Sequence, residues 1–165
     1  MSIAQTIIQE LETEAAITRR VLERVPETRF NWSPHPKSRT LGTLSMHIAG
    51  NPGSVMTLAS QNPAEHPGNA DVTPKSTAEV LTTLDASVAD AKRMLEGMSD
   101  AQFTETWRVR ANGRELMAMP RMAFLRMVLL NHWYHHRGQL SVYLRELDVP
   151  LPSIYGPSAD ENLFM

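Results

Sequence analysis

The chain has 165 residues, of which 42% are hydrophobic and 21% charged, the ordinary balance of a globular protein. It contains no cysteine, which excludes disulfides, thiolate metal ligands and a cysteine nucleophile. The formal net charge is −2, without a block of Lys or Arg or an apolar run of about 18 residues, so neither nucleic acid nor a membrane is an expected partner.

The first predicted helix spans residues 2–25. Ser2 and Gln5 form a capping-box pattern at its start. Apolar residues then recur at helical spacing, while the charged residues outside that stripe indicate a solvated face: Glu10, Glu12, Glu14, Arg19 and Arg20. Because this segment is acidic and lacks a basic region, it does not resemble a signal peptide, and we expect a cytoplasmic protein. Residues 26–39 follow as a loop.

A second helix is predicted to begin after Thr40, a residue type that caps helix N-termini well. Leu41, Leu44, His47 and Ile48 form its apolar face, which places a histidine among residues that are usually buried. Pro52 should kink or break this helix, because proline lacks an N–H and clashes with the carbonyl four residues back. A further helical segment should cover residues 53–60. Residues 61–75 are rich in Pro, Asn and Gly, and we expect a mobile loop there.

The third predicted helix runs over residues 77–98 after a second capping-box pattern, formed by Ser76 and Glu79. Ser99 and Gln102 suggest a short helical turn. Weak alternation on both sides of Asn112-Gly113, a type I′ turn signal, then favours a short hairpin or an extended crossover.

The fourth predicted helix, residues 120–147, begins at Pro120 and ends before Pro150 and Pro152. On a helical wheel its apolar stripe contains His132 and His136, one turn apart. The remaining tail is irregular. Four amphipathic helices in one domain, residues 1–165, predict an all-α four-helix bundle.

Histidines at i and i+4 lie close enough to share a metal ion. Alone, the pair formed by His132 and His136 is better explained as core histidines, because no general base lies between them. A third histidine on an apolar face, His47, reverses that preference. Three protein ligands leave one position open, which is the catalytic zinc pattern, although nickel, copper or iron also suit imidazole. His35, His66 and His135 should not belong to the site.

Residues 32–38, 41–49, 131–140 and 152–161 together make the chain resemble the DinB/YfiT-like family. The characteristic features are L-x-x-H-I, ending at Ile48, and H-x-x-x-H-R-G-Q, beginning at His132. The resemblance implies a four-helix bundle, usually a homodimer, with a divalent metal ion, zinc or nickel, held by His47, His132 and His136. The family name refers to DNA-damage induction. The one departure from the family pattern is the Asn51-Pro52-Gly53 segment, which bears on the shape of the pocket.

Two functions remain open. Relatives include transferases and isomerases that use low-molecular-weight thiols, so this chain could be a metal-dependent enzyme of that type or a hydrolase, acting on a small molecule. The alternative is a non-catalytic, dimeric metal-binding module that responds to stress or damage. No general base stands at a diagnostic spacing. Gln139 and Tyr143 share the histidine face and are candidate pocket residues. The Met-rich segment 117–127 offers a candidate dimer surface.

Overall fold

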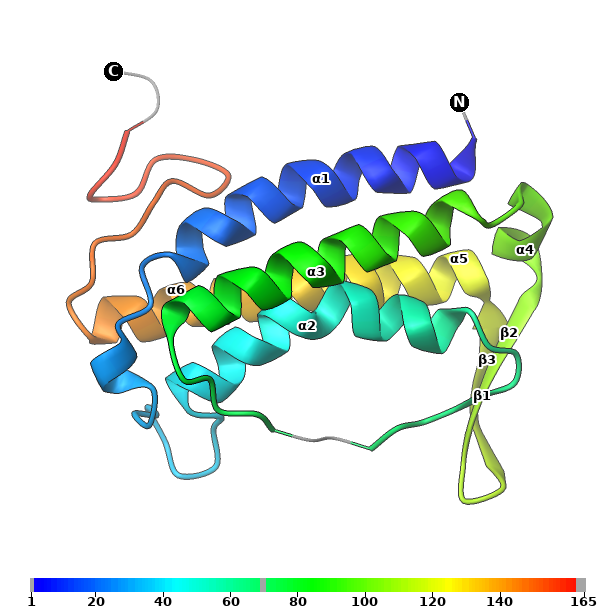
Figure 1. Cartoon of the computed structure of the whole chain (residues 1–165), viewed down its shortest axis with the longest axis horizontal. Coiled ribbons are helices and arrows are strands. Elements are labelled where there is room, and N and C mark those ends of the chain that lie inside the picture. Colours follow the sequence, from blue (N-terminus) through cyan, green and yellow to red (C-terminus); the bar gives the residue numbers. More distant parts are fainter. Residues whose placement is uncertain (1, 69–70, 163–165) are drawn as a thin grey trace.

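The computed structural model describes residues 2–68 and 71–162, and within these ranges the fold is a bundle of four long helical columns (Figure 1). The first three columns are α1 (Ile3–Leu22), α2 (Leu41–Ala59) and α3 (Thr77–Glu96). The fourth consists of α5 (Arg121–Phe124), the π-helix η2 (Leu125–Asn131) and α6 (His132–Glu146). None of the described helices combines the length and hydrophobicity needed to cross a lipid bilayer. The predicted all-α bundle is confirmed.

The predicted helix starts are largely confirmed. The Ser2 hydroxyl accepts from the Gln5 amide at 3.2 Å, and the Gln5 side chain accepts from the Ser2 amide at 2.9 Å, which completes the capping box. Thr40 caps α2. At α3 only half of the predicted box forms, because the Glu79 carboxylate accepts from the Lys75 amide at 2.6 Å. The first helix ends at Leu22, three residues earlier than expected.

Of the kink or break expected at Pro52, the break is wrong, since α2 runs continuously through the proline. Proline leaves the carbonyl of Ile48, four residues back, without its helical donor. The indole Nε1–H of Trp133 donates to that carbonyl at 2.8 Å and supplies the missing hydrogen bond. Next to it, the Asn51 side chain donates to the Leu129 carbonyl at 3.2 Å, within η2. Each of the two helical columns therefore supplies a side-chain donor to a backbone carbonyl of the other.

The expected hairpin is confirmed as β2 (Thr106–Ala111) and β3 (Arg114–Pro120), joined at Asn112 and Gly113. These two residues have φ of 51° and 76°, as a type I′ turn requires. β1 (Ala64–Glu65) pairs parallel to β2, so the sheet order is β1-β2-β3. The expectation of a mobile loop over residues 61–75 falls partly on residues 69–70, which lie outside the described residues.

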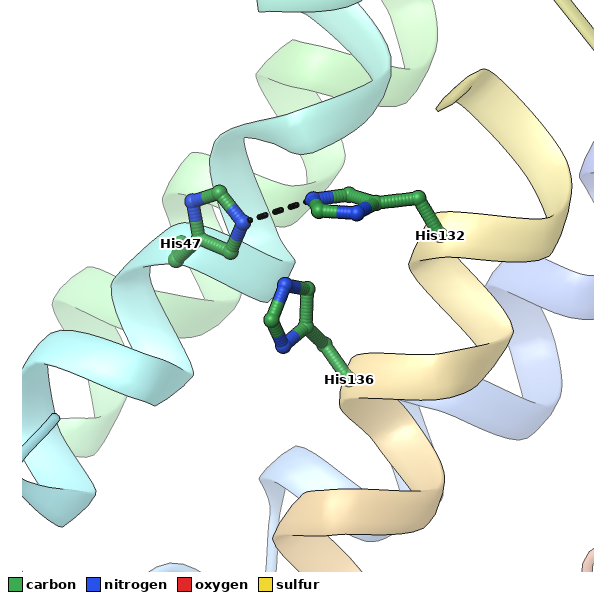
Figure 2. A group of neighbouring side chains, drawn as sticks. All are labelled: His47, His132 and His136. Atoms are coloured by element: carbon green, nitrogen blue, oxygen red, sulfur yellow. Dashed lines mark hydrogen bonds between the residues drawn. The ribbon is translucent and has the colours of Figure 1, made fainter. Parts of the chain in front are cut away.

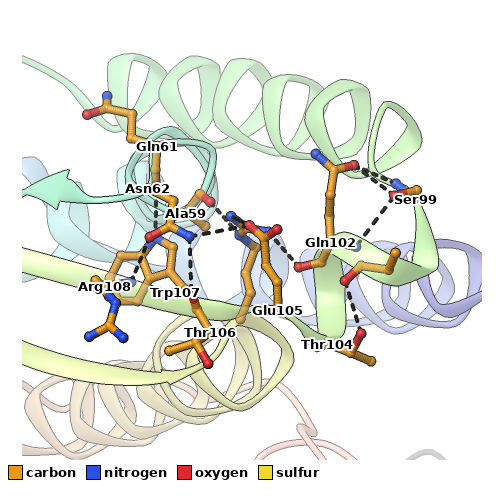
Figure 3. A network of polar contacts seen from close by, with 12 residues as sticks. Ala59, Gln61, Asn62, Ser99, Gln102, Thr104, Glu105, Thr106, Trp107 and Arg108 are labelled. Atoms are coloured by element: carbon orange, nitrogen blue, oxygen red, sulfur yellow. Dashed lines mark hydrogen bonds and ion pairs between the residues drawn. The ribbon is translucent and has the colours of Figure 1, made fainter.

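The hairpin extends from one end of the bundle and is tied to it by polar contacts (Figures 1 and 3). The Asn62 side chain donates to the Thr106 carbonyl at 3.0 Å and accepts from the Arg108 amide at 3.1 Å. Trp107 Nε1 donates to the Gln61 carbonyl at 2.8 Å. The short helix α4 (Asp100–Thr104), capped by Ser99 and Gln102 as expected, leads into β2. The sheet thus lies at one end of the bundle (Figure 1).

The solvated face expected for α1 needs one correction, because Glu14 is buried. It pairs with Arg137 of α6, whose side chain is only 1% exposed, at 2.6 Å between Oε2 and Nη1. The hydroxyl of Tyr155, in the irregular C-terminal tail, donates to the same Glu14 oxygen, Oε2, at 2.8 Å. An ion pair therefore fastens α1, α6 and the tail together.

Candidate metal centre

His47, His132 and His136 come together between α2 and α6 (Figure 2). Their candidate ligand nitrogens all lie within 4.8 Å of one another, and in the described residues no other group of three His, Asp or Glu side chains meets that condition. The rings are nearly perpendicular, with centroids 4.3 to 5.3 Å apart. The sequence-based expectation that these three converge is therefore met by the geometry.

The nitrogen positions fit a metal ion. His47 Nε2 and His132 Nε2 are 3.1 Å apart. Two nitrogens bound tetrahedrally to one ion, each at about 2.0–2.1 Å, would be separated by about 3.3 Å. The pair therefore needs only a small shift to share an ion.

A hydrogen bond to a neighbouring side chain sets the orientation of the His136 ring. Its Nδ1 lies 2.9 Å from Gln139 Oε1, one turn along α6. Because an amide oxygen can only accept, Nδ1 carries the proton and Nε2 presents its lone pair. A hydrogen bond of this kind commonly fixes the tautomer of a metal-binding histidine. Gln139, a candidate pocket residue from the sequence, therefore contacts the triad through His136. Among the described residues no hydrogen bond or ring pair joins Tyr143 to the histidines; its hydroxyl donates to the Arg39 carbonyl at 3.3 Å.

The three imidazoles are kept neutral by their surroundings. Burial, followed by the nearby positive charge of Arg39, lowers the pKa of His47 to about 4. Burial also lowers the pKa of His136 to about 4, despite an opposing contribution from Gln139. The pKa of His132 is lowered by burial, then by His135 and Arg39. Neutral imidazole is the form that binds metal, so all three side chains are ready to coordinate near neutral pH.

The remaining histidines lie outside the triad, as expected. His35 is exposed, and its Nδ1 accepts from the Lys37 amide at 3.1 Å. His135 is also exposed, on the outer side of α6. His66 does not reach the triad, but it lines the adjoining pocket, where the Gly68 amide donates to its Nδ1 at 3.0 Å.

A pocket of about 550 Å³ opens beside the triad and is lined by His47 and His132. Its walls come from α2, α3, η2 and the described part of residues 66–72. Sequence reasoning missed Arg39, which lies at this pocket and pairs with Asp71 at 2.9 Å between Nε and Oδ1. The available signal was an arginine directly before the cap of the histidine-bearing helix, but its partner is separated by a long loop.

The DinB superfamily model matches residues 10–140. The uncharacterised protein YrdA of Bacillus subtilis strain 168 is 27% identical over 159 residues, which cover 93% of this chain and 89% of YrdA. A DinB-like protein from Bacillus cereus ATCC 10987 superposes with a TM-score of 0.73 at 22% identity, covering 93% of this chain and 98% of that one. For the DinB-like protein YjoA of Bacillus subtilis these values are 0.68, 15%, 95% and 99%.

The two structural likenesses are below 25% identity and bear on the fold alone. The family model covers most of the chain and agrees with both the helical bundle and the resemblance noted in the sequence. The chain belongs to the DinB superfamily.

Proposed function

We propose that this protein is a metal-dependent enzyme whose divalent ion, zinc or nickel, is held by His47, His132 and His136. The observation that carries the proposal is the convergence of three neutral, partly buried imidazoles beside a pocket of about 550 Å³. A structural zinc site is normally closed by four protein ligands, whereas three leave a position for substrate.

When bound, the ion supplies Lewis acidity, which makes a substrate thiol or a water molecule acidic enough to act as a nucleophile near neutral pH. The chain's own part is to position and shield. Gln139 holds the His136 ring in one tautomer, and burial keeps the imidazoles uncharged. Because the chain contains no cysteine, the thiol of a transfer reaction would come from a small molecule. We therefore favour thiol-dependent transfer or isomerisation, with hydrolysis as the variant that uses water.

One observation favours the alternative, a non-catalytic metal-binding module. Among the described residues that line the pocket, Asp71 is the only carboxylate, and it is engaged by Arg39. No carboxylate among these residues is therefore free to act as a general base, which leaves His66 in the lining, the substrate or solvent for that role. Catalysis that relies on metal-promoted acidity does not need such a base, which is why we place the enzyme first.

Metal content decides the ligand assignment. Purified wild-type protein should contain about one divalent ion per chain by elemental mass spectrometry. His47→Ala and His132→Ala should each lose the ion, and the double variant should add little, because one missing ligand already disables the site. His135→Ala, which alters an exposed neighbour, is the matched control and should retain the metal.

Circular dichroism on the same variants separates function from folding. The core of the bundle is apolar and does not depend on the ion, so both single variants should stay helical with a lower melting temperature than metal-loaded wild type. Variants that unfold at room temperature would assign the site a structural role. Folded variants with full metal would refute the ligand assignment. A screen for metal-dependent loss of free thiol with electrophilic substrates then tests the enzyme against the non-catalytic module.

We also propose a homodimer, in keeping with the family resemblance. The Met-rich segment supports this less than the sequence suggested, because Met117, Met119 and Met122 pack on the chain's own core. Met127, at 40% exposure, remains available on η2. Sedimentation velocity at micromolar concentration should give a dimer, and a monomer would refute it.

A further inference from the structure

The pocket beside the triad has a distinct charge at one end. Among its described lining residues, Arg39 alone carries a permanent positive charge. Its side chain is 27% exposed, and its contact with Asp71 uses only Nε. Nη1 and Nη2 have no hydrogen-bond partner within residues 2–68 and 71–162. A guanidinium with free terminal nitrogens suits a planar, two-pronged acceptor such as a carboxylate.

The bond from Arg39 to Asp71 can be exchanged. The Asp71 side chain is 53% exposed, and ion pairs between such exposed groups are weak. The backbone of Arg39 is held in place independently, because its carbonyl accepts from the Tyr143 hydroxyl at 3.3 Å. Asp71 therefore shows that a carboxylate fits against Arg39, while the weakness of the pair allows a ligand carboxylate to replace it.

The rest of the pocket runs along one face of α2, on which Thr43, His47, Gly50, Ser54 and Leu58 recur at helical spacing. Arg39 lies directly before Thr40, the cap of α2, and at 1.5 Å per residue Leu58 lies roughly 16 Å after His47 along the helix axis. Apolar side chains contribute to the lining along its length, beside polar ones such as Ser54 and Thr83: Met46, Val55, Leu58, Val72 and Val128. A ligand along this face meets positive charge at the Arg39 end and apolar side chains beside the triad.

We propose that the substrate is a small carboxylic acid with an apolar body, whose carboxylate binds Arg39 in place of Asp71. This inference rests on the proposed function and specifies its substrate class. The carboxylate anchors one end, the apolar body follows α2, and the reacting atom lies between them, beside His47 and His132. The charge of Arg39 reaches this position, since it contributes to the lowered pKa of each histidine in the triad.

The test uses the full chain in metal-free form, so that a carboxylate cannot bind a metal ion instead. Hexanoate, hexan-1-ol and hexyl phosphate share one apolar chain and differ in the head group. Each is titrated into labelled protein, and the amide shifts of α2 give its affinity. Wild type should bind hexanoate about tenfold or more tightly than hexan-1-ol, as expected for charge-assisted hydrogen bonds.

Arg39→Gln should remove the preference for hexanoate over the alcohol. Asp71→Asn should raise hexanoate affinity several-fold, because it removes the competing carboxylate. Arg93→Gln is the matched control, since Arg93 is 72% exposed on α3 and pairs within its own helix with Asp90. It should bind hexanoate as wild type does.

Three results would overturn the proposal: a preference for hexanoate that persists in Arg39→Gln, tighter binding of hexyl phosphate than of hexanoate, or weaker hexanoate binding in Asp71→Asn. Metal content is measured on the same preparations and tests the proposed function separately. Loss of the metal site with intact hexanoate binding would refute the enzyme alone, and the reverse would refute the carboxylate alone.

Discussion

His136 and Arg137 are adjacent on α6, yet they lie in opposite kinds of polar surroundings. Arg137 is 1% exposed and has several partners: Glu14, Thr18 and Tyr155 accept its hydrogen bonds, and the rings of Tyr134 and Tyr155 lie 5.3 and 5.0 Å from its Cζ. His136 has a single hydrogen-bond partner within the described residues, Gln139, on the side away from the triad. One side of the helix is saturated with internal contacts, and on the other the His136 ring lies against the rings of His47 and His132.

This difference indicates that one side of α6 stabilises the fold and the other side is suited to bind a metal ion. The Arg137 side uses a full charge, completely paired, to join three segments of the chain. On the His136 side the groups are neutral imidazoles, and their candidate ligand nitrogens lie close to one another. Stability should therefore depend mainly on the first side, and metal affinity mainly on the second.

The largest expected effect comes from Arg137→Leu. It leaves the Glu14 carboxylate, 11% exposed, without its cation, and removing one partner of a buried pair costs about 3–5 kcal/mol of unfolding free energy. Urea denaturation measures the loss. Arg126→Leu is the control, because its pair with Glu10 is exposed and should contribute about 1 kcal/mol or less. Equal losses in the two variants would break the comparison.

Trp133→Phe should cost about 1–3 kcal/mol, because it leaves the buried Ile48 carbonyl without a donor. Pro52→Ala restores a backbone N–H that can donate to the same carbonyl. In the Pro52→Ala background the tryptophan change should therefore cost clearly less, which a double-mutant cycle by urea denaturation will detect. Additive losses would show that the indole and the proline are not linked.

Gln139→Ala should weaken metal binding about tenfold while changing the unfolding free energy of the metal-free protein little, because it frees the His136 ring without emptying the core. Gln139→Glu keeps an acceptor for Nδ1 and should retain or raise affinity. Competition with a chelator of known affinity measures both. If Gln139→Ala binds metal as wild type does, the amide has no part in orienting the ring.

The smallest effect concerns the tail that covers the Arg137 side. Arg145 lowers the pKa of Asp160, while the Ser153 amide and then Arg20 lower that of Glu161. Since both folded pKa values lie below the unfolded ones, the contribution to docking is present above about pH 4 and is lost as the pH falls through the lowered values. The protection factors of amides in residues 150–161, which correct for the pH dependence of intrinsic exchange, should therefore fall between pH 5 and pH 3. They should already be low at pH 5 in an Asp160→Asn, Glu161→Gln variant, and unchanged protection would contradict the role of these carboxylates.

The parts of the molecule that depend on local pattern could be predicted from sequence. Helix starts could be predicted from residues that cap N-termini, namely Ser2, Thr40 and Ser99. The apolar stripes that contain His47, His132 and His136 predict that these rings face the interior. The parts that failed depend on distant partners. Pro52 favours a kink or break as long as the hydrogen bond from Trp133 to the Ile48 carbonyl is unknown. Glu14 is predicted to be solvated as long as its ion pair with Arg137 is unknown. The ion pair of Arg39 with Asp71 likewise cannot be predicted, because no periodicity links a loop residue to the residue before a helix cap.

The hydrogen bond between Trp133 and the Ile48 carbonyl has a consequence for how the site is filled. Packed helices can slip past one another by one turn, about 5.4 Å. In α2, proline leaves one particular carbonyl in need of a donor, so the indole fixes the register of α6 against α2. Ile48 follows His47, and Trp133 follows His132. The same hydrogen bond therefore holds His47 beside His132 and His136 before a metal ion binds. Metal uptake should then proceed as simple bimolecular capture by a preorganised site, with a rate proportional to ion concentration and no slow folding phase.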